Sequence, residues 1–201
     1  MQVSFIFSIA ILIFSIVLHE VSHGYAADRL GDRTARLAGR LTLNPLKHLD
    51  FFGSIILPSL TFLLGGFIFG WAKPVPYNPY NLKDQRWGEA KVAFAGPLSN
   101  LLIAFIFGLG IRFGFVAANF LTPVTLIVLI NIVLAIFNLI PIPPLDGSKI
   151  LFSLLPYKYL YIRTFLERYS FALILLLVFF LWSLLLPIIA FVFSLMTGIL
   201  L

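Results

Sequence analysis

Long apolar runs separated by short polar segments dominate the chain. The first run, from about Val3 to Ala27, is long enough for a helix of about 36 Å, which crosses a bilayer. Further apolar runs occupy Phe51–Gly70, Val92–Phe115 and Leu121–Ile140, and the 33 residues of 169–201 carry no charge. This pattern predicts an all-α integral membrane protein, a polytopic helical bundle of about four to six membrane segments.

The second run, Phe51–Gly70, has two interpretations. Its 20 residues suffice for a spanning helix, but Pro58 and four glycines would bend it. Basic residues flank it on both sides, which places both of its ends on the same side of the membrane. We therefore favour a re-entrant element, and a plain transmembrane helix is the alternative.

The uncharged tail from Tyr169 to Leu201 predicts one spanning helix to about Leu186, followed by Pro187 and a piece too short to cross the membrane. Its expected role is packing. The motifs discussed below occupy about residues 15–150, and no polar stretch is long enough to fold alone. We therefore expect residues 1–201 to form a single domain.

Composition agrees with a membrane protein, because 61% of the residues are hydrophobic, 11% are charged and the mean hydropathy is +1.05. Soluble proteins have about 25% charged residues. The net charge of +6 does not indicate a nucleic-acid partner, since the basic residues flank apolar runs, as expected of a protein in a lipid bilayer. The chain has no cysteine, so histidine and carboxylate would have to hold any metal.

The fourteen basic residues fall into groups of five, four, one and four along the polar segments. The larger groups, in residues 28–50, 71–91 and 149–168, mark the cytoplasmic side, and the single Arg112 marks the outer side. The first helix then runs from outside to inside. This predicts a multi-pass protein of the cell membrane.

Ionisable side chains interrupt the first run at His19-Glu20-Val21-Ser22-His23. Histidines four residues apart on a helix face the same way and can bind one zinc ion, and Glu20 can reach a water molecule on that ion without being a ligand itself. Such groups are costly inside a membrane and mark functional sites, although hydrogen bonding to neighbouring helices is an alternative. We predict one Zn²⁺ per chain, bound by His19 and His23 toward the cytoplasmic side.

A catalytic zinc usually has a third protein ligand. Most carboxylates lie beside arginine or lysine in polar loops, where solvated charges are expected: Asp28, Asp32, Asp50, Asp84, Glu89 and Glu167. Asp146 instead follows an apolar helix and the proline-rich turn Pro141–Leu145, and the topology places it on the same side as the histidines. We predict Asp146 as the third ligand.

Several other polar residues carry open interpretations. Asn131 is expected to form interhelical hydrogen bonds, whereas Asn100 and Asn138 could do the same or stabilise an oxyanion or the substrate backbone. His48 could support the site, contact the substrate, or be a surface histidine at the membrane boundary. The loop Trp71–Pro79, with three prolines, could be a plain connector or an edge that holds an unwound substrate by strand addition.

Three motifs resemble, in order, those of the site-2 proteases, the intramembrane zinc metalloproteases of peptidase family M50. They are HEVSH at 19–23, AGPLSN at 95–100 and NLIPIPPLDG at 138–147. The segments RLTLNPLKHLD and GWAKPVPYNP are similar to the compact prokaryotic branch without PDZ or CBS domains. The resemblance covers about residues 15–150.

The resemblance implies zinc bound by His19, His23 and Asp146, Glu20 as the general base, and helper roles in catalysis for Asn100 and Asn138. It implies a zinc metalloendopeptidase that hydrolyses peptide bonds within or near transmembrane helices of membrane-protein substrates, as in regulated intramembrane proteolysis. Two rival functions use the same residues differently. One is a zinc- or proton-coupled transporter, and the other is a catalytically inactive membrane scaffold.

Overall fold

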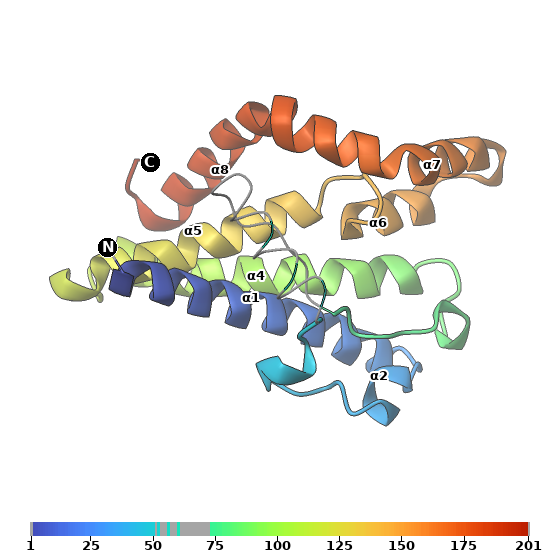
Figure 1. Ribbon diagram of the computed structural model, residues 1–201, viewed down its shortest axis with the longest axis horizontal. Coiled ribbons are helices and arrows are strands. Elements are labelled where there is room, and N and C mark those ends of the chain that lie inside the picture. Colours follow the sequence, from blue (N-terminus) through green and yellow to red (C-terminus); the bar gives the residue numbers. More distant parts are fainter. Residues whose placement is uncertain (1, 51, 53–55, 57–59, 61–72, 201) are drawn as a thin grey trace.

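The computed structural model describes residues 2–50, 52, 56, 60 and 73–200, and this part of the chain is mainly helical (Figure 1). Four of its helical stretches are long and apolar enough to cross a membrane: Ile6–Arg29, Gly88–Arg112, Ala118–Asn138 and Leu160–Thr197. The predicted all-α membrane bundle is therefore confirmed. The α-helices are α1 (Gln2–Arg29), α2 (Thr34–Leu37), α4 (Gly88–Arg112), α5 (Leu121–Asn138), α6 (Asp146–Leu154), α7 (Leu160–Leu176) and α8 (Trp182–Thr197).

The three helices α1, α4 and α5 form the centre of the bundle. In Figure 1, α1 and α5 run in the same direction and α4 runs against both. The final turns of α1 and α5 therefore lie at the same end of the bundle as the first turns of α4. The polar motifs of the chain occupy this end.

Small and apolar residues let these helices pack closely. Ala104 of α4, Ile132 of α5 and Phe193 of α8 belong to one buried cluster. Gly108 of α4 faces α8 so closely that an added Cβ would lie 2.9 Å from the Cβ of Met196. Lipid tails are as apolar as the side chains, so burial of apolar surface does not draw helices together in a membrane. Close packing at small residues is therefore the usual way in which membrane helices associate.

A buried hydrogen-bond network joins α1, α4 and α5. The side-chain amide of Asn100 donates to Oδ1 of Asn131 at 2.8 Å, and the amide of Asn131 donates to the Ser15 hydroxyl at 2.9 Å. Asn100 and Asn131 are fully buried, and Ser15 is nearly so. The predicted interhelical role of Asn131 is confirmed.

The tail differs from its prediction. Helix α7 already begins at Leu160, and the π-helical turn η6 (Leu177–Leu181) joins it to α8, where the path bends (Figure 1). Pro187 lies inside α8, so the expected break there is wrong. The wider π-helical turn takes up the change in direction, and membrane helices tolerate a proline because neighbouring groups satisfy the freed backbone.

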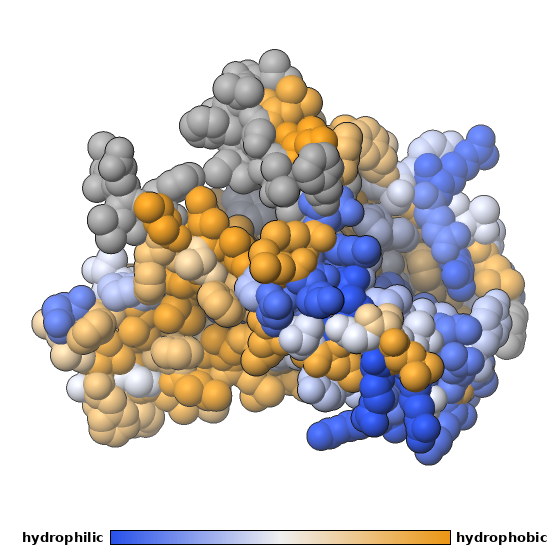
Figure 2. Space-filling model, turned by 60° about the horizontal axis from the view of Figure 1, so that its bottom comes forward, coloured by the Kyte–Doolittle hydropathy of each residue, from blue (hydrophilic) through white to orange (hydrophobic). Residues whose placement is uncertain are grey.

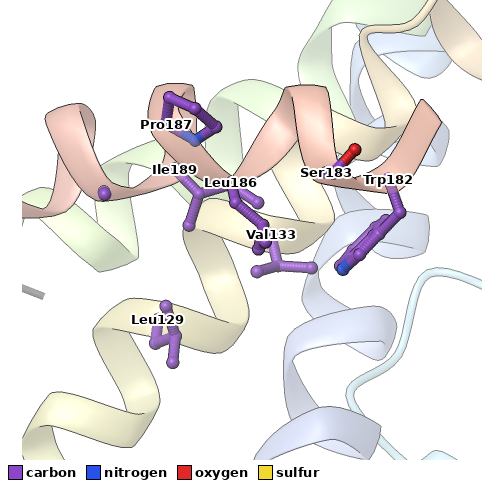
Figure 3. A pocket seen from close by; sticks show the side chains of 8 residues that line it. Leu129, Val133, Trp182, Ser183, Leu186, Pro187 and Ile189 are labelled. Carbon is purple, nitrogen blue, oxygen red and sulfur yellow. The ribbon is translucent and has the colours of Figure 1, made fainter.

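An apolar groove of about 560 Å³ lies between parts of α5 and α8 (Figure 3). Leu129 and Val133 line it from α5, and Trp182, Leu186 and Pro187 line it from α8. None of the residues predicted to bind zinc takes part. The groove therefore belongs to the packing of the tail, and the polar end of the bundle must be considered separately.

The proline-rich stretch between α2 and α4 contains no regular secondary structure over residues 73–78. It ends where the side chain of Asn78 caps the short helix η3 (Pro79–Asn81) by accepting from the amide of Tyr80. Residues 71 and 72, and most of the segment 51–70 with its two interpretations, lie outside the described residues. Figure 2 shows hydrophobic surface over one half of the molecule and hydrophilic surface toward the other.

Candidate metal centre

The two histidines of the HEVSH motif lie in the second half of α1, with their rings close together. Their ring centroids are 4.7 Å apart, and both side chains are buried among α1, α4 and α6. The spacing of four residues on a continuous helix produces this arrangement, as expected from sequence.

Asp146 reaches the histidines from the first residue of α6. Its Oδ2 atom lies 3.1 Å from Nε2 of His19 and 3.1 Å from Nε2 of His23. The turn after α5 brings it there, and this turn leaves no room for a side chain at Gly147, where an added Cβ would lie 2.5 Å from the Ile140 carbonyl oxygen and closer still to Leu139. The structure thus brings together the three residues predicted as ligands.

Hydrogen bonds at Nδ1 determine which nitrogen of each imidazole faces Asp146. His23 Nδ1 lies 2.7 Å from the Val92 carbonyl oxygen, which only accepts, so Nδ1 carries a proton. His19 Nδ1 lies 2.6 Å from Oδ1 of Asn100, whose amide nitrogen donates to the Ser15 carbonyl and thereby fixes the orientation of the amide. A neutral imidazole in this tautomer has its lone pair on Nε2, as a metal ligand requires.

The donor atoms fit a zinc ion. One atom from each of the three residues lies within 4.8 Å of the others. A tetrahedral zinc with bonds of about 2.0 Å separates its ligands by about 3.3 Å, close to the 3.1 Å between each Nε2 and the carboxylate. Two imidazole lone pairs that face a carboxylate oxygen repel it unless a cation lies between them. This donor set therefore favours a bound metal.

Gly96 of α4 forms the wall opposite the histidines. An added Cβ would lie 2.6 Å from Nε2 of His19 and closer still to Nε2 of His23. The space beside both ligand nitrogens is therefore open only because residue 96 has no side chain. This glycine belongs to the sequence motif AGPLSN, but its role at the site was not predicted.

A lysine and a tyrosine flank the carboxylate of Asp146. Lys149 Nζ lies 3.4 Å from Oδ1, the oxygen that faces away from the histidines, and 5.4 Å from the ring centroid of Tyr77. The positive charge of Lys149 favours the ionised form of the Asp146 carboxylate, which is the form that binds a metal. Neither Lys149 nor Tyr77 was predicted from the sequence to lie at the site.

Glu20 follows His19 in α1, and a backbone amide of the proline-rich segment donates a hydrogen bond to its side chain. Its Oε2 atom accepts a hydrogen bond of 2.9 Å from the backbone amide of Val75, and its side chain is half-buried. Glu20 is not part of the cluster of three ligand atoms found among the described residues.

The two asparagines predicted to assist catalysis occupy different places. Asn100 bonds directly to His19 and is fully buried. The side-chain amide of Asn138 donates to the Leu134 carbonyl of its own helix at 2.9 Å. Asn100 therefore orients a predicted ligand, whereas the hydrogen bond of Asn138 is local to α5.

Replacing Asn100 with alanine is expected to weaken zinc binding by about 10- to 100-fold, because outer partners of metal-binding histidines have effects of this size. The measurement is competition with a chelator of known zinc affinity. Asn138→Ala is the matched control and should keep the wild-type affinity. Equal losses in both variants would contradict a specific role of Asn100 at His19.

His48 is buried, so the alternative of a surface histidine is wrong. Its Nε2 atom lies 2.8 Å from the Thr42 carbonyl oxygen, and its own carbonyl accepts from the backbone amide of Lys73 at 2.8 Å. The latter bond ties the end of the 42–48 segment to the proline-rich segment. A role of His48 in contacting the substrate stays a prediction.

Asp32 is also buried, although a solvated charge was expected. It accepts hydrogen bonds from the Thr34 hydroxyl at 2.5 Å, the backbone amide of Asn78 at 2.7 Å and the side chain of Asn81 at 2.9 Å. Burial raises the pKa of Asp32, but these donors together outweigh it and lower the pKa below its ordinary value. An aspartate two residues before a threonine was the local signal, since it typifies an Asx turn.

Asp32→Asn is expected to lower the free energy of unfolding by about 1–3 kcal/mol at pH 7, because the replacement cannot satisfy the same donors. Because the pKa of Asp32 is lower in the folded than in the unfolded protein, its ionised carboxylate stabilises the fold at pH values above the unfolded-state pKa of about 4. This stabilisation is lost as the pH falls through the lower folded-state pKa. Thermal unfolding at pH 7 and below pH 4 should therefore show a shrinking difference from wild type. Glu167→Gln removes an exposed ion pair with Arg163 and should change stability little at either pH.

Comparisons with known proteins point to one family. A family model described as Peptidase family M50 matches residues 7–117 and 110–181. Three relatives carry the name "putative zinc metalloprotease": YwhC of Bacillus subtilis is 44% identical, Rip2 of Mycolicibacterium smegmatis 35% and MJ0611 of Methanocaldococcus jannaschii 33%. The matches cover 72%, 71% and 75% of this chain, and 67%, 55% and 78% of the respective relatives. The chain thus spans little more than half of Rip2, and no solved structure matches it significantly.

Proposed function

Because this chain belongs to peptidase family M50, we propose that it is a zinc endopeptidase that hydrolyses peptide bonds within or near transmembrane helices of membrane-protein substrates. The observation that carries the proposal is the meeting of His19, His23 and Asp146 inside a bundle of membrane helices, with Glu20 next to His19 in the same helix. Three protein ligands leave a fourth position for water, which distinguishes a catalytic zinc site from a structural one.

Each residue of the site has a separate task in this proposal. When bound, zinc lowers the pKa of a water molecule toward 7 and polarises the scissile carbonyl. His19, His23 and Asp146 hold the metal, and Asn100 and the Val92 carbonyl keep the two imidazoles in the required tautomer. Glu20 removes a proton from the attacking water and passes it to the leaving amine.

A transmembrane substrate must unwind locally, because a helix engages its amides in internal hydrogen bonds. Residues 73–78 are suited to receive such a strand next to Glu20, since Pro74 and Pro76 favour extended backbone and Val75 contacts the Glu20 carboxylate. Arg40 supports this segment from behind by donating to the Lys73 carbonyl at 2.9 Å. We propose that the substrate backbone lies along this segment during cleavage.

The site is placed toward the cytoplasmic side of the cell membrane in this proposal. The support is the distribution of basic residues, which is dense at the polar end of the bundle and sparse near Arg112. The lipid bilayer is then the immediate environment of both enzyme and substrate.

The test is a cleavage assay with the purified chain in vesicles and a model single-span substrate. Zinc-loaded protein should cut the substrate within or near its membrane segment, and removal of zinc with a chelator should stop cleavage until zinc is restored. If the protein binds zinc and a broad set of single-span substrates stays intact, an inactive scaffold is supported. If zinc crosses the membrane in the same vesicles, a transporter is supported.

A further inference from the structure

Exposed leucines and exposed basic residues occur together in the segment that follows α1. Leu37 is 84% exposed, Leu46 74% and Leu43 54%. Arg33, Arg36 and Lys47 are exposed in the same segment. We call these six residues the basic apolar surface. It belongs to the side of the molecule that comes forward in Figure 2, where hydrophilic and hydrophobic surface lie next to each other.

Two of the three acidic residues near this surface, Asp28 and Asp32, are turned away from solvent, and Asp50 is half-buried. The Asp28 side chain is 9% exposed and pairs with Arg36. Asp32 is fully buried among its hydrogen-bond donors. The charge that the segment presents outward is therefore mainly positive, although five basic and three acidic residues occur between 28 and 50.

The position of this surface in the chain places it at a membrane boundary. The apolar stretch of α1 ends at Arg29, four residues before Arg33. Exposure of these leucines to water is unfavourable. An interface with lipid offers them an apolar layer directly beneath a layer of phosphates. Arginine and lysine next to them match anionic headgroups in charge.

We propose that the basic apolar surface docks on anionic phospholipids of the leaflet at the polar end of the bundle. Leu37, Leu43 and Leu46 enter the boundary between headgroups and acyl chains, and Arg33, Arg36 and Lys47 contact the phosphates. The alternative occupant is a second copy of this chain, but its surface would have to offer negative charge around an apolar patch. An anionic bilayer offers both and adjoins the segment already.

The inner side of the same segment holds the backbone beside Glu20. Asp32 accepts from the Asn78 amide at 2.7 Å, and Arg40 donates to the Lys73 carbonyl at 2.9 Å. Between these two anchors, the Val75 amide contacts Glu20. Lipid docking thus steadies the element to which the proline-rich segment is attached. The docking itself is independent of any hydrolytic activity.

The chain has no cysteine, so one introduced cysteine gives a unique site for a nitroxide label. Leu37→Cys and Leu46→Cys place the label on the basic apolar surface. Tyr80→Cys, at a residue 87% exposed in η3, is the control outside it. Collision of the nitroxide with oxygen reports lipid, and collision with a water-soluble nickel chelate reports water. The protein is measured in phosphatidylcholine vesicles with and without phosphatidylglycerol.

In vesicles with phosphatidylglycerol, labels at 37 and 46 should collide more with oxygen and less with nickel than the label at 80. Removing phosphatidylglycerol, or adding Arg33→Gln and Lys47→Gln, should shift both labels toward water. Arg86→Gln with Arg168→Gln makes the same charge change at exposed positions elsewhere and should shift neither label.

Three results would overturn the proposal. Labels at 37 and 46 could be as accessible to nickel as the label at 80 under all conditions. The labels could also enter lipid as deeply without phosphatidylglycerol, and in the Arg33→Gln, Lys47→Gln variant, as they do in the wild-type background with phosphatidylglycerol. That result would show that anionic lipid is not the partner. They could also become protected only when the protein is concentrated in the membrane, which would identify a second copy as the occupant.

Discussion

Replacing Glu20 with glutamine is expected to reduce cleavage of a single-span substrate by roughly 10²- to 10⁴-fold, the usual contribution of a general acid–base group. The zinc content should stay at the wild-type level, because Glu20 is not one of the three clustered ligands. Glutamine has the same shape, and its oxygen can still accept from the Val75 amide, so the proline-rich segment should keep its place. Cleavage and zinc content are measured on the same preparation.

Glu167→Gln provides the control for this experiment, because it removes one carboxylate from an exposed ion pair on α7. It should cut the substrate at the wild-type rate. If Glu20→Gln lost zinc together with activity, Glu20 would be a ligand. That result would contradict its assignment as a base and would favour the transporter.

Gly96→Ala is expected to remove zinc binding almost completely, together with all cleavage. The added methyl group would occupy the space beside Nε2 of both histidines, at 2.6 Å from that of His19. Neither the methyl group nor the helix backbone of α4 can move away without disturbing Asn100, one turn later on the same helix. The rings would have to rotate out of the ligand position and give up their hydrogen bonds at Nδ1.

Gly110→Ala is the matched control, since it makes the same change on the same helix. Among the residues that the structure describes, an added Cβ there meets Val116 alone, at 3.4 Å, which is an ordinary contact. This variant should bind zinc as wild type does and should be no less stable, because alanine favours the helix. Full zinc occupancy in Gly96→Ala would show that the metal does not lie between the histidines and α4.

The parts of the site that follow from helix periodicity and topology could be predicted from sequence. His19 and His23 share a face because they are one turn apart, and Asp146 meets them because α1 and α5 run in the same direction. Gly96 could not be assigned, because its role depends on how closely α4 approaches α1. The burial of Asp32 likewise depends on donors from residues 78 and 81, almost fifty positions away.

The errors in the fold have similar causes. Pro187 predicted a break in the tail, since proline disrupts helices in water, yet the bend occurs at the π-helical turn ten residues earlier. His48 was equally compatible with surface and interior, because one histidine in a polar segment carries no periodic signal. Asn131 was predicted correctly, since an amide in the middle of an apolar helix must find a partner on a neighbouring helix.

The zinc affinity of Asp146→Asn, measured beside wild type by chelator competition, tests the central claim most directly. The account predicts one tightly bound zinc per wild-type chain and an affinity loss larger than the roughly 10- to 100-fold expected for partners outside the ligand set. An Asp146→Asn protein that remains folded and binds zinc as tightly as wild type would contradict the three-residue metal centre.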